Sequence, residues 1–183
     1  NNLQEAQNYY QKVLKIDPNH SQALNNLAVI FTNLKEYQKA KSCYEKAIEY
    51  NSNYTNAHFN LGNLFKKLGE NQKAKSCYEK AIEINPNYTD AHNNLGLVFV
   101  ELRDYKKAEE CYEKVIEIDP NHLGALNNLG SIFDELGENQ KAKSCFEKAI
   151  EINPNHVDSY NNLGMIFKKL GENQKAKSCY EKA

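Results

Sequence analysis

The dominant feature of this sequence is a period of 34 residues that continues along the chain without insertions. Several positions in the period carry the same residue type in copy after copy. They form a leucine register (Leu27, Leu61, Leu95, Leu129, Leu163), a phenylalanine register (Phe31, Phe65, Phe99, Phe133, Phe167) and an alanine register (Ala6, Ala40, Ala74, Ala108, Ala142, Ala176). A fixed period of this size is typical of a solenoid, in which one small unit stacks on copies of itself. A solenoid presents a long surface rather than one enclosed cavity, which favours binding over catalysis.

The first half of one unit, residues 55–88, has the spacing of an amphipathic helix. Its main apolar side chains are Ala57, Leu61, Leu64 and Leu68, which recur at intervals of three and four residues. This spacing places them on one face of a helix. Thr55 is expected to cap the start of this helix, and Gly69 to close it in the left-handed conformation.

The second half of the same unit predicts another helix, from Gln72 to Ile84, with Ala74 and Tyr78 on its inner side. Pro86 stops this helix, because proline cannot continue a helix and restricts the residue before it. Each unit is therefore a helical hairpin whose two apolar stripes are covered only when units stack. The expected fold class is all-α, with about eleven antiparallel helices and a core that is continuous along the array.

These registers resemble those of the tetratricopeptide repeat (TPR) family over the full length of the chain. The matching residues are the Leu-Gly pairs that begin at Leu61, Leu95, Leu129 and Leu163, the phenylalanine and alanine registers, an aromatic register (Tyr10, Tyr44, Tyr78, Tyr112, Phe146, Tyr180), and Pro18, Pro86, Pro120 and Pro154. The resemblance implies a right-handed superhelical solenoid. In family terms residues 1–183 form one array, with a trailing half-repeat (1–20), full repeats at 21–54, 55–88, 89–122 and 123–156, and an incomplete repeat (157–183). Because the chain begins and ends within a unit, we expect it to be part of a longer array.

The five cysteines also follow the period, at Cys43, Cys77, Cys111, Cys145 and Cys179. Equivalent helices of a solenoid are separated by an intervening helix, whereas a disulfide requires Cα atoms within about 7 Å. The cysteines are therefore interpreted as half-buried apolar residues of a reducing compartment, the cytoplasm or nucleus. The histidines repeat in the same way, so no metal site and no cofactor are expected.

The charge composition argues against two classes of partner. The net charge is −1, so nothing attracts the whole molecule to nucleic acid or to an anionic membrane. No apolar run approaches the roughly 20 residues that a bilayer requires. RNA binding was considered because related helical-hairpin repeats bind single-stranded RNA, but those repeats need a basic groove. No catalytic constellation emerges from the repeated surface residues, so the chain is not expected to be an enzyme.

A polar strip remains on the first helix of each unit once the packing registers are removed. It has two registers, one of Asn26, Asn60, Asn94, Asn128 and Asn162, and one of Asn25, Phe59, Asn93, Asn127 and Asn161. In the resembled family the first helices line the concave surface, which places both registers there. An asparagine amide offers donors and an acceptor, which suits a peptide backbone. We expect an extended segment of a partner protein to bind there; the alternative is that the asparagines are structural or merely consensus residues.

Other residues of the strip differ between units and are candidates for specificity. Phe59, Leu97, Val100 and Met165 are apolar at polar positions, and are candidate contacts for apolar side chains. Charge also varies, with Lys66 and Lys67 basic, Glu101, Asp134 and Glu135 acidic, and Lys168 and Lys169 basic again. The alternative is a solvated face with random variation.

The asparagine ladder also resembles the repeat region of the O-GlcNAc transferase and SPINDLY group. This resemblance covers the array only, and asparagine before Leu-Gly is common in the general repeat. Two functions are therefore considered. The first is a non-enzymatic scaffold that binds an extended peptide, and the alternative is the substrate-targeting arm of a glycosyltransferase whose catalytic domain lies outside this chain.

The two ends of the sequence interrupt the stack and lack the polar capping helix of a finished repeat array. We therefore predict that the isolated chain either associates end to end or frays at its terminal helices. Residues 55–122 should show the strongest protection when amide hydrogen exchange is measured along the chain. Uniform protection up to both ends in a monodisperse monomer would contradict this expectation.

Overall fold

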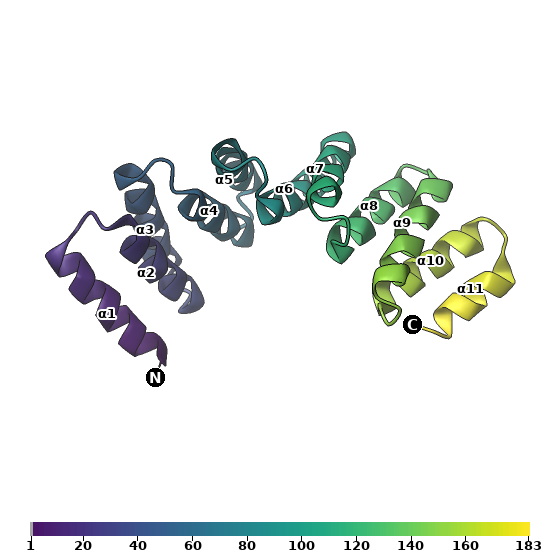
Figure 1. The fold of residues 1–183 in the computed structure, drawn as a ribbon, viewed down its shortest axis with the longest axis horizontal. Coiled ribbons are helices and arrows are strands. Elements are labelled where there is room, and N and C mark those ends of the chain that lie inside the picture. Colours follow the sequence, from purple (N-terminus) through teal and green to yellow (C-terminus); the bar gives the residue numbers. More distant parts are fainter. Residues whose placement is uncertain (1) are drawn as a thin grey trace. The chain divides into compact units, whose positions relative to one another are not determined.

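A computed structural model describes residues 2–183 of the chain, and within these residues all regular secondary structure is helical (Figure 1). There are eleven helices in the described residues: α1 (Asn2–Ile16), α2 (Ser21–Asn33), α3 (Tyr37–Tyr50), α4 (Thr55–Lys67), α5 (Asn71–Ile84), α6 (Thr89–Glu101), α7 (Tyr105–Ile118), α8 (Leu123–Glu135), α9 (Asn139–Ile152), α10 (Val157–Lys169) and α11 (Asn173–Tyr180). The all-α fold class and the helix count expected from the period are confirmed.

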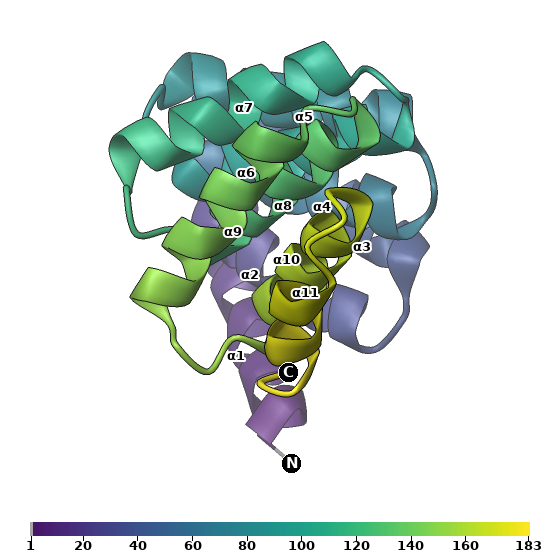
Figure 2. The same ribbon diagram turned by 90° about the vertical axis from the view of Figure 1, so that its right-hand side faces the viewer.

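The helices belong to two compact parts of the chain, one ending at Val98 and the other running from Phe99 to Ala183. Each part holds several hairpins, and from here on we call the two parts the first unit and the second unit. In the first unit α2 packs on α3 and α4 on α5; in the second α8 packs on α9 and α10 on α11. Figures 1 and 2 show these pairs as hairpins joined by short loops. The even-numbered helices, which we term first helices, start at residues 21, 55, 89, 123 and 157. The helices that follow them are termed second helices.

The hairpins close on a contact between a glycine of the first helix and an aromatic ring of the second. A Cβ atom added to Gly62 would lie 2.7 Å from Cε1 of Tyr78, and one added to Gly130 would lie 2.7 Å from Cε1 of Phe146. These rings are 0% and 1% exposed. Glycine permits this approach without displacing the ring, which explains the Leu-Gly pairs of the sequence. In α2 the same register holds Ala28, which is buried together with Tyr44.

The loop between the two helices of a hairpin turns through a residue of positive φ. Gly69, Gly137 and Gly171 have φ of 76°, 77° and 78°, and so the left-handed conformation expected for Gly69 is confirmed. The same register holds Lys35 and Arg103, with φ of 60° and 59°. A side chain is strained in this conformation, so these two loops are less favourable than the glycine loops.

The starts of the first helices differ from the sequence expectation. Thr55 is the first helical residue rather than the cap, and Tyr54 before it makes no side-chain capping bond. Instead, three other first helices are capped by histidine. Nδ1 of His20, His122 and His156 accepts from the backbone N–H of Ala23, Ala125 and Ser159, at 3.3, 3.0 and 3.2 Å. The expected stripe was also too long, since Leu68 lies past the end of α4 and is 38% exposed.

No cysteine forms a disulfide within the described residues. Cys111, Cys145 and Cys179 are buried and the other two are half-buried. Burial raises the pKa of Cys77 from its ordinary value of 9.0 to about 11, and that of Cys145 likewise to about 11. A raised pKa keeps these thiols protonated and unreactive at neutral pH, as expected for residues that serve packing.

We predict that Arg103→Gly stabilises the protein by about 1 kcal/mol, because glycine removes the strain of the left-handed conformation. The urea midpoint of unfolding, followed by circular dichroism, measures the effect. The matched control is Gly137→Ala at the same register, where nothing lies within 4 Å of the added Cβ, so any loss is conformational. A lower midpoint for Arg103→Gly would contradict the prediction.

Candidate binding surface

In each unit the first helices of successive hairpins contact one another, α2 with α4 and α8 with α10. The two asparagine registers are hydrogen-bonded across these contacts. Nδ2 of Asn60 donates to Oδ1 of Asn25 at 3.0 Å, and Nδ2 of Asn162 donates to Oδ1 of Asn127 at 3.1 Å. We call these bonded registers the asparagine ladder. One register thus supplies donors and the other acceptors, and each bond ties two hairpins together.

The ladder takes another path between α4 and α6, because Phe59 occupies the place of Asn25 and has no acceptor. There Nδ2 of Asn94 donates to Oδ1 of Asn63 at 2.9 Å, and the hydroxyl of Tyr78 donates to the same oxygen at 2.7 Å. Asn63 was not identified from the sequence. The register of Asn63 holds a different residue in each first helix, and Phe59 stands where an asparagine acceptor is expected. These two departures together are the signal that could have identified Asn63.

Asn26 and Asn93 make other hydrogen bonds. Asn26 donates to the hydroxyl of Tyr10 at 3.1 Å and accepts from Asn25 at 3.2 Å. Asn93 donates to Asn94 at 3.5 Å. The pKa of Tyr112 is raised, mainly by burial and also by Cys111, while the neighbouring amide of Asn128 acts in the opposite direction. The buried hydroxyl of Tyr112 makes no hydrogen bond to the described residues.

The ladder positions differ in how much of each amide is left for a ligand. Asn25 is only 4% exposed and is therefore enclosed by packing, whereas Asn161 is exposed and its side chain makes no hydrogen bond to residues 2–183. Asn60 and Asn162 are half-buried. Within the described residues their Oδ1 atoms accept no hydrogen bond, and each Nδ2 has a second N–H. These two amides can therefore offer both a donor and an acceptor to another chain.

The apolar residues of the strip also differ in accessibility. The ring of Phe59 is half-buried, with its centroid 4.9 Å from that of Tyr88 and 5.9 Å from that of Tyr78. Met165 is 45% exposed, while Leu97 is half-buried. The register of these last two residues also holds Val29, which is 37% exposed and which sequence analysis did not single out. Following the whole register 29, 63, 97, 131 and 165 would have found it.

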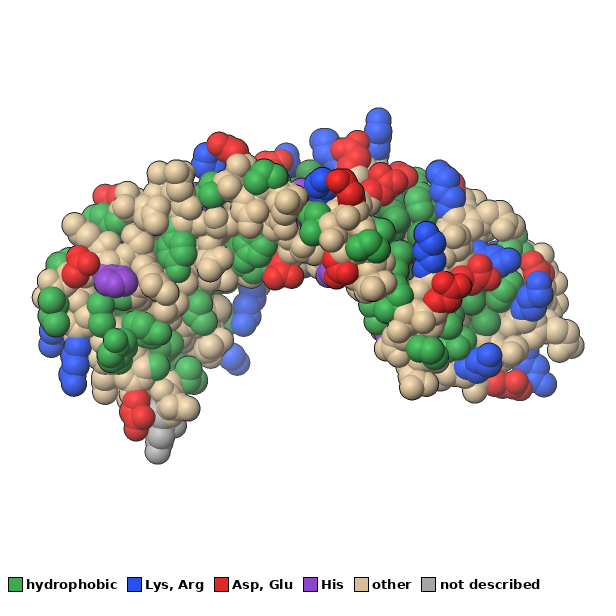
Figure 3. Space-filling view, in the orientation of Figure 1, with side chains coloured by type: hydrophobic (Ala, Val, Ile, Leu, Met, Phe, Trp, Pro, Cys, Tyr) green, Lys and Arg blue, Asp and Glu red, His purple; other side chains and the backbone are tan. Residues whose placement is uncertain are grey.

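The charges of the strip are partly paired. Nζ of Lys169 lies 2.5 Å from Oδ1 of Asp134, so this ion pair joins α8 to α10. The two residues therefore do not act as separate basic and acidic sites, in contrast to the sequence expectation. Lys66 is half-buried and Lys67 lies over the ring of Tyr37 at 5.5 Å. On the face shown in Figure 3, acidic and basic side chains are interspersed over the second unit.

Two further features bear on the kind of site. Among residues 2–183 no group of three or more His, Cys, Asp or Glu side chains is placed to hold a metal ion. No helix in the same range is long and apolar enough to cross a membrane.

Comparisons with known proteins agree with this architecture. Residues 1–183 match the family described as Cilia and flagella-associated protein 70 C-terminal domain. The solved structure of YrrB, titled a TPR protein with an unusual peptide-binding site, is 25% identical, with a TM-score of 0.81 over 94% of this chain and 89% of that one. MamA from Desulfovibrio magneticus RS-1 is 20% identical (TM-score 0.82; 89% and 92% covered). A TPR protein from Parabacteroides merdae is 22% identical (TM-score 0.81; 98% and 72% covered). No curated protein matches the chain.

We predict that Asn127→Ala destabilises the second unit by about 1–2 kcal/mol. The substitution removes the acceptor of two bonds, from Asn162 at 3.1 Å and from the hydroxyl of Ser159 at 3.3 Å. Thermal or urea unfolding measures the loss. Asn161→Ala is the matched control, since Asn161 has the same register but is exposed and unbonded within the described residues, and it should be neutral. Equal effects of the two substitutions would argue against a structural role for the ladder.

Proposed function

Because the chain belongs to the family of the cilia and flagella-associated protein 70 C-terminal domain, a family of TPR proteins, we propose that it is a non-enzymatic scaffold that binds an extended segment of a partner protein. The binding surface of this proposal is the strip along the first helices of each unit. It comprises the asparagine ladder and the adjoining register of Val29, Asn63, Leu97, Ser131 and Met165.

The observation that carries the proposal is the unused half of the ladder amides. Asn60 and Asn162 each donate one N–H to a neighbouring helix. The second N–H and the carbonyl oxygen of each amide make no hydrogen bond within the described residues. An extended peptide has one donor and one acceptor per residue, so it can bond to such an amide through its backbone alone. The bond to the neighbouring helix holds the amide in place, which lowers the entropy that binding would cost.

Exposed apolar side chains beside the amides supply the means of discrimination. Val29 and Met165 stand in one register with Asn63, Leu97 and Ser131, so the chemistry changes from one first helix to the next. Side chains of the bound segment would meet these positions while its backbone bonds to the ladder. The printed title of YrrB, a TPR protein with a peptide-binding site, supports this class of ligand.

We further propose that the partner is a protein of a cilium or flagellum, in line with the description of the family. The site of action in this proposal is a reducing compartment, the cytoplasm or nucleus. The five cysteines, none of which forms a disulfide in the described residues, support that assignment. The mixed surface charge supports a protein partner rather than a nucleic acid.

The alternative, a substrate-targeting arm of an O-GlcNAc transferase or SPINDLY-like enzyme, would use the same strip. It rests on the asparagine ladder alone, and the ladder bonds between helices give those asparagines a structural reason to recur. The scaffold function therefore has the broader support. The full-length open reading frame distinguishes the two, since the alternative requires a glycosyltransferase domain outside residues 1–183.

We predict that Met165→Glu weakens peptide binding by about tenfold, because it places a charge on the exposed apolar position that the strip has on α10. Peptides selected from a displayed random library against the wild-type chain would serve as the probe, with affinity measured by fluorescence anisotropy. The matched control is Ile152→Glu at the end of α9, since Ile152 is similarly exposed (38%) but lies outside the strip. It should leave the affinity unchanged.

The contribution of the ladder amides to affinity is tested separately with Asn162→Ala and the same peptides. It should lower the affinity for peptides of different sequence by similar factors, because backbone bonds do not depend on side chains. Selected peptides that bind Met165→Glu and Asn162→Ala as tightly as the wild type would show that the strip is not the binding surface.

A further inference from the structure

Helix α4 carries an aromatic contact at the register where the other first helices have an asparagine. The ring centroid of Phe59 lies 4.9 Å from that of Tyr88 and 5.9 Å from that of Tyr78. Tyr78 is fully buried, whereas Phe59 and Tyr88 are half-buried. We call these three rings, all of which belong to the first unit, the aromatic cluster. Part of its apolar surface therefore remains accessible along the strip.

The rings of the aromatic cluster are held in place by the protein itself. Cε1 of Tyr78 packs so closely on Gly62 that a Cβ atom added there would lie 2.7 Å from it, and the hydroxyl of Tyr78 donates to Asn63 at 2.7 Å. The hydroxyl of Tyr88 donates to Oδ1 of Asn56 at 3.5 Å. Because the rings are ordered before a ligand arrives, a contact with them costs little conformational entropy.

The amide next to the aromatic cluster can act only as a donor. Asn63 lies one helical turn after Phe59, on the same face of α4. Its Oδ1 accepts from Nδ2 of Asn94 at 2.9 Å and from the hydroxyl of Tyr78 at 2.7 Å, and these two bonds use both lone pairs of the oxygen. Within the described residues neither N–H of Asn63 donates a hydrogen bond. The amide therefore offers two donors and no acceptor to a ligand.

This donor-only amide differs from those of Asn60 and Asn162, each of which keeps an acceptor as well as a donor. The difference follows from Phe59. A phenylalanine supplies no acceptor for Asn94, which bonds instead to Asn63 and occupies its oxygen. One substitution thus accounts both for an apolar aromatic surface and for the donor-only chemistry beside it.

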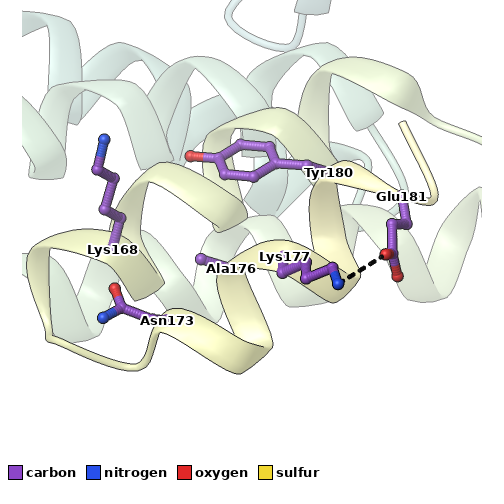
Figure 4. Close-up of a pocket in the computed structure, with 6 residues that line it drawn as sticks. All are labelled: Lys168, Asn173, Ala176, Lys177, Tyr180 and Glu181. Atoms are coloured by element: carbon purple, nitrogen blue, oxygen red, sulfur yellow. Dashed lines mark ion pairs between the residues drawn. The ribbon is translucent and has the colours of Figure 1, made fainter.

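The C-terminal hairpin shows the same register without this chemistry. Tyr180, the equivalent aromatic residue of α11, lines a groove on α10 and α11 (Figure 4). Asn161 stands there in the place of Phe59, so the first helix contributes no second ring. Met165 stands in the place of Asn63 and has no N–H to donate. Sites of the two kinds therefore select different residues of a bound segment.

We propose that the aromatic cluster and Asn63 bind a proline residue in the extended segment of the partner protein, an inference that rests on the proposed function and specifies its ligand. The proline ring packs on Phe59 and Tyr88, and a carbonyl oxygen of the segment accepts from Asn63. Proline has an apolar ring and a carbonyl acceptor but no backbone N–H. Any other residue would bring an N–H that Asn63 cannot accept. Proline-rich segments are also extended before they bind, and they dock in grooves lined by aromatic side chains.

Parallel selections test this preference for proline. A displayed library of random peptides is selected against the wild-type chain and, separately, against Phe59→Asn. The variant introduces the asparagine that the other first helices have in this register, and circular dichroism establishes that it remains helical. Proline should be enriched at one position of the peptides that the wild type selects, and should not be enriched in those that Phe59→Asn selects.

Affinities of synthetic peptides from the wild-type selection measure the effect. Alanine in place of the enriched proline removes the ring and restores an N–H, and should weaken binding to the wild type by about three- to tenfold. The same replacement should change binding to Phe59→Asn by less than about twofold. N-methylalanine, which lacks both the ring and the N–H, should give an intermediate affinity for the wild type. The control variant Tyr50→Asn removes a ring that is 45% exposed at the end of α3, outside the strip, and should behave as the wild type.

Two results would overturn the inference and leave the proposed function standing. One is a set of selected peptides without enriched proline whose binding is nevertheless weakened by Met165→Glu. The other is an equal loss of affinity for wild type and Phe59→Asn when proline is replaced by alanine. A folded wild-type chain that selects no peptide would instead contradict the proposed function, and this inference together with it.

Discussion

The close contact between a glycine of the first helix and the aromatic ring of the second helix, seen in the hairpins α4–α5, α8–α9 and α10–α11, is the constraint on which the remaining structure depends. It sets the spacing of the hairpin at Gly62 and Tyr78, at Gly130 and Phe146, and at Gly164 and Tyr180. A Cβ atom added to any of these glycines would lie within 2.7 Å of the ring, so a larger residue would push the two helices apart or displace the ring. The first helix of the next hairpin then packs on a surface of constant shape, which brings the asparagines of successive first helices within hydrogen-bonding distance.

The asparagine ladder therefore has a structural task before it can have a binding one. Asn25 and Asn127 accept bonds from the following first helix, which gives asparagine a structural role at these two positions without any ligand. The same bonds orient Asn60 and Asn162 and leave part of each amide unused. One asparagine can thus serve both helix packing and ligand binding. The proposed function depends on the second N–H and the carbonyl oxygen of each amide, which packing leaves unbonded.

Departures from the period mark the positions at which one hairpin differs from the next. Phe59 removes an acceptor, so the ladder moves to Asn63 and gains the hydroxyl of Tyr78 as a second donor. Asp134 creates an ion pair with Lys169, whereas Lys168 reverses the charge at the equivalent place. A strictly periodic chain would offer identical surfaces on each hairpin. These substitutions give the strip a different chemistry on each first helix.

The sequence by itself determined the helices, their pairing as hairpins and the buried registers, because apolar spacing, proline and glycine act over a few residues. The left-handed Gly69 and the burial of Ala74 and Tyr78 follow from such local patterns. Only the tertiary structure decided that Asn60 bonds to Asn25 and Asn94 to Asn63, since these partners lie 35 and 31 residues apart. It also decided that histidine caps α2, and that Asn25 is enclosed while Asn161 is exposed. Distances between packed helices depend on the side chains of several hairpins at once, so a local sequence pattern does not predict them.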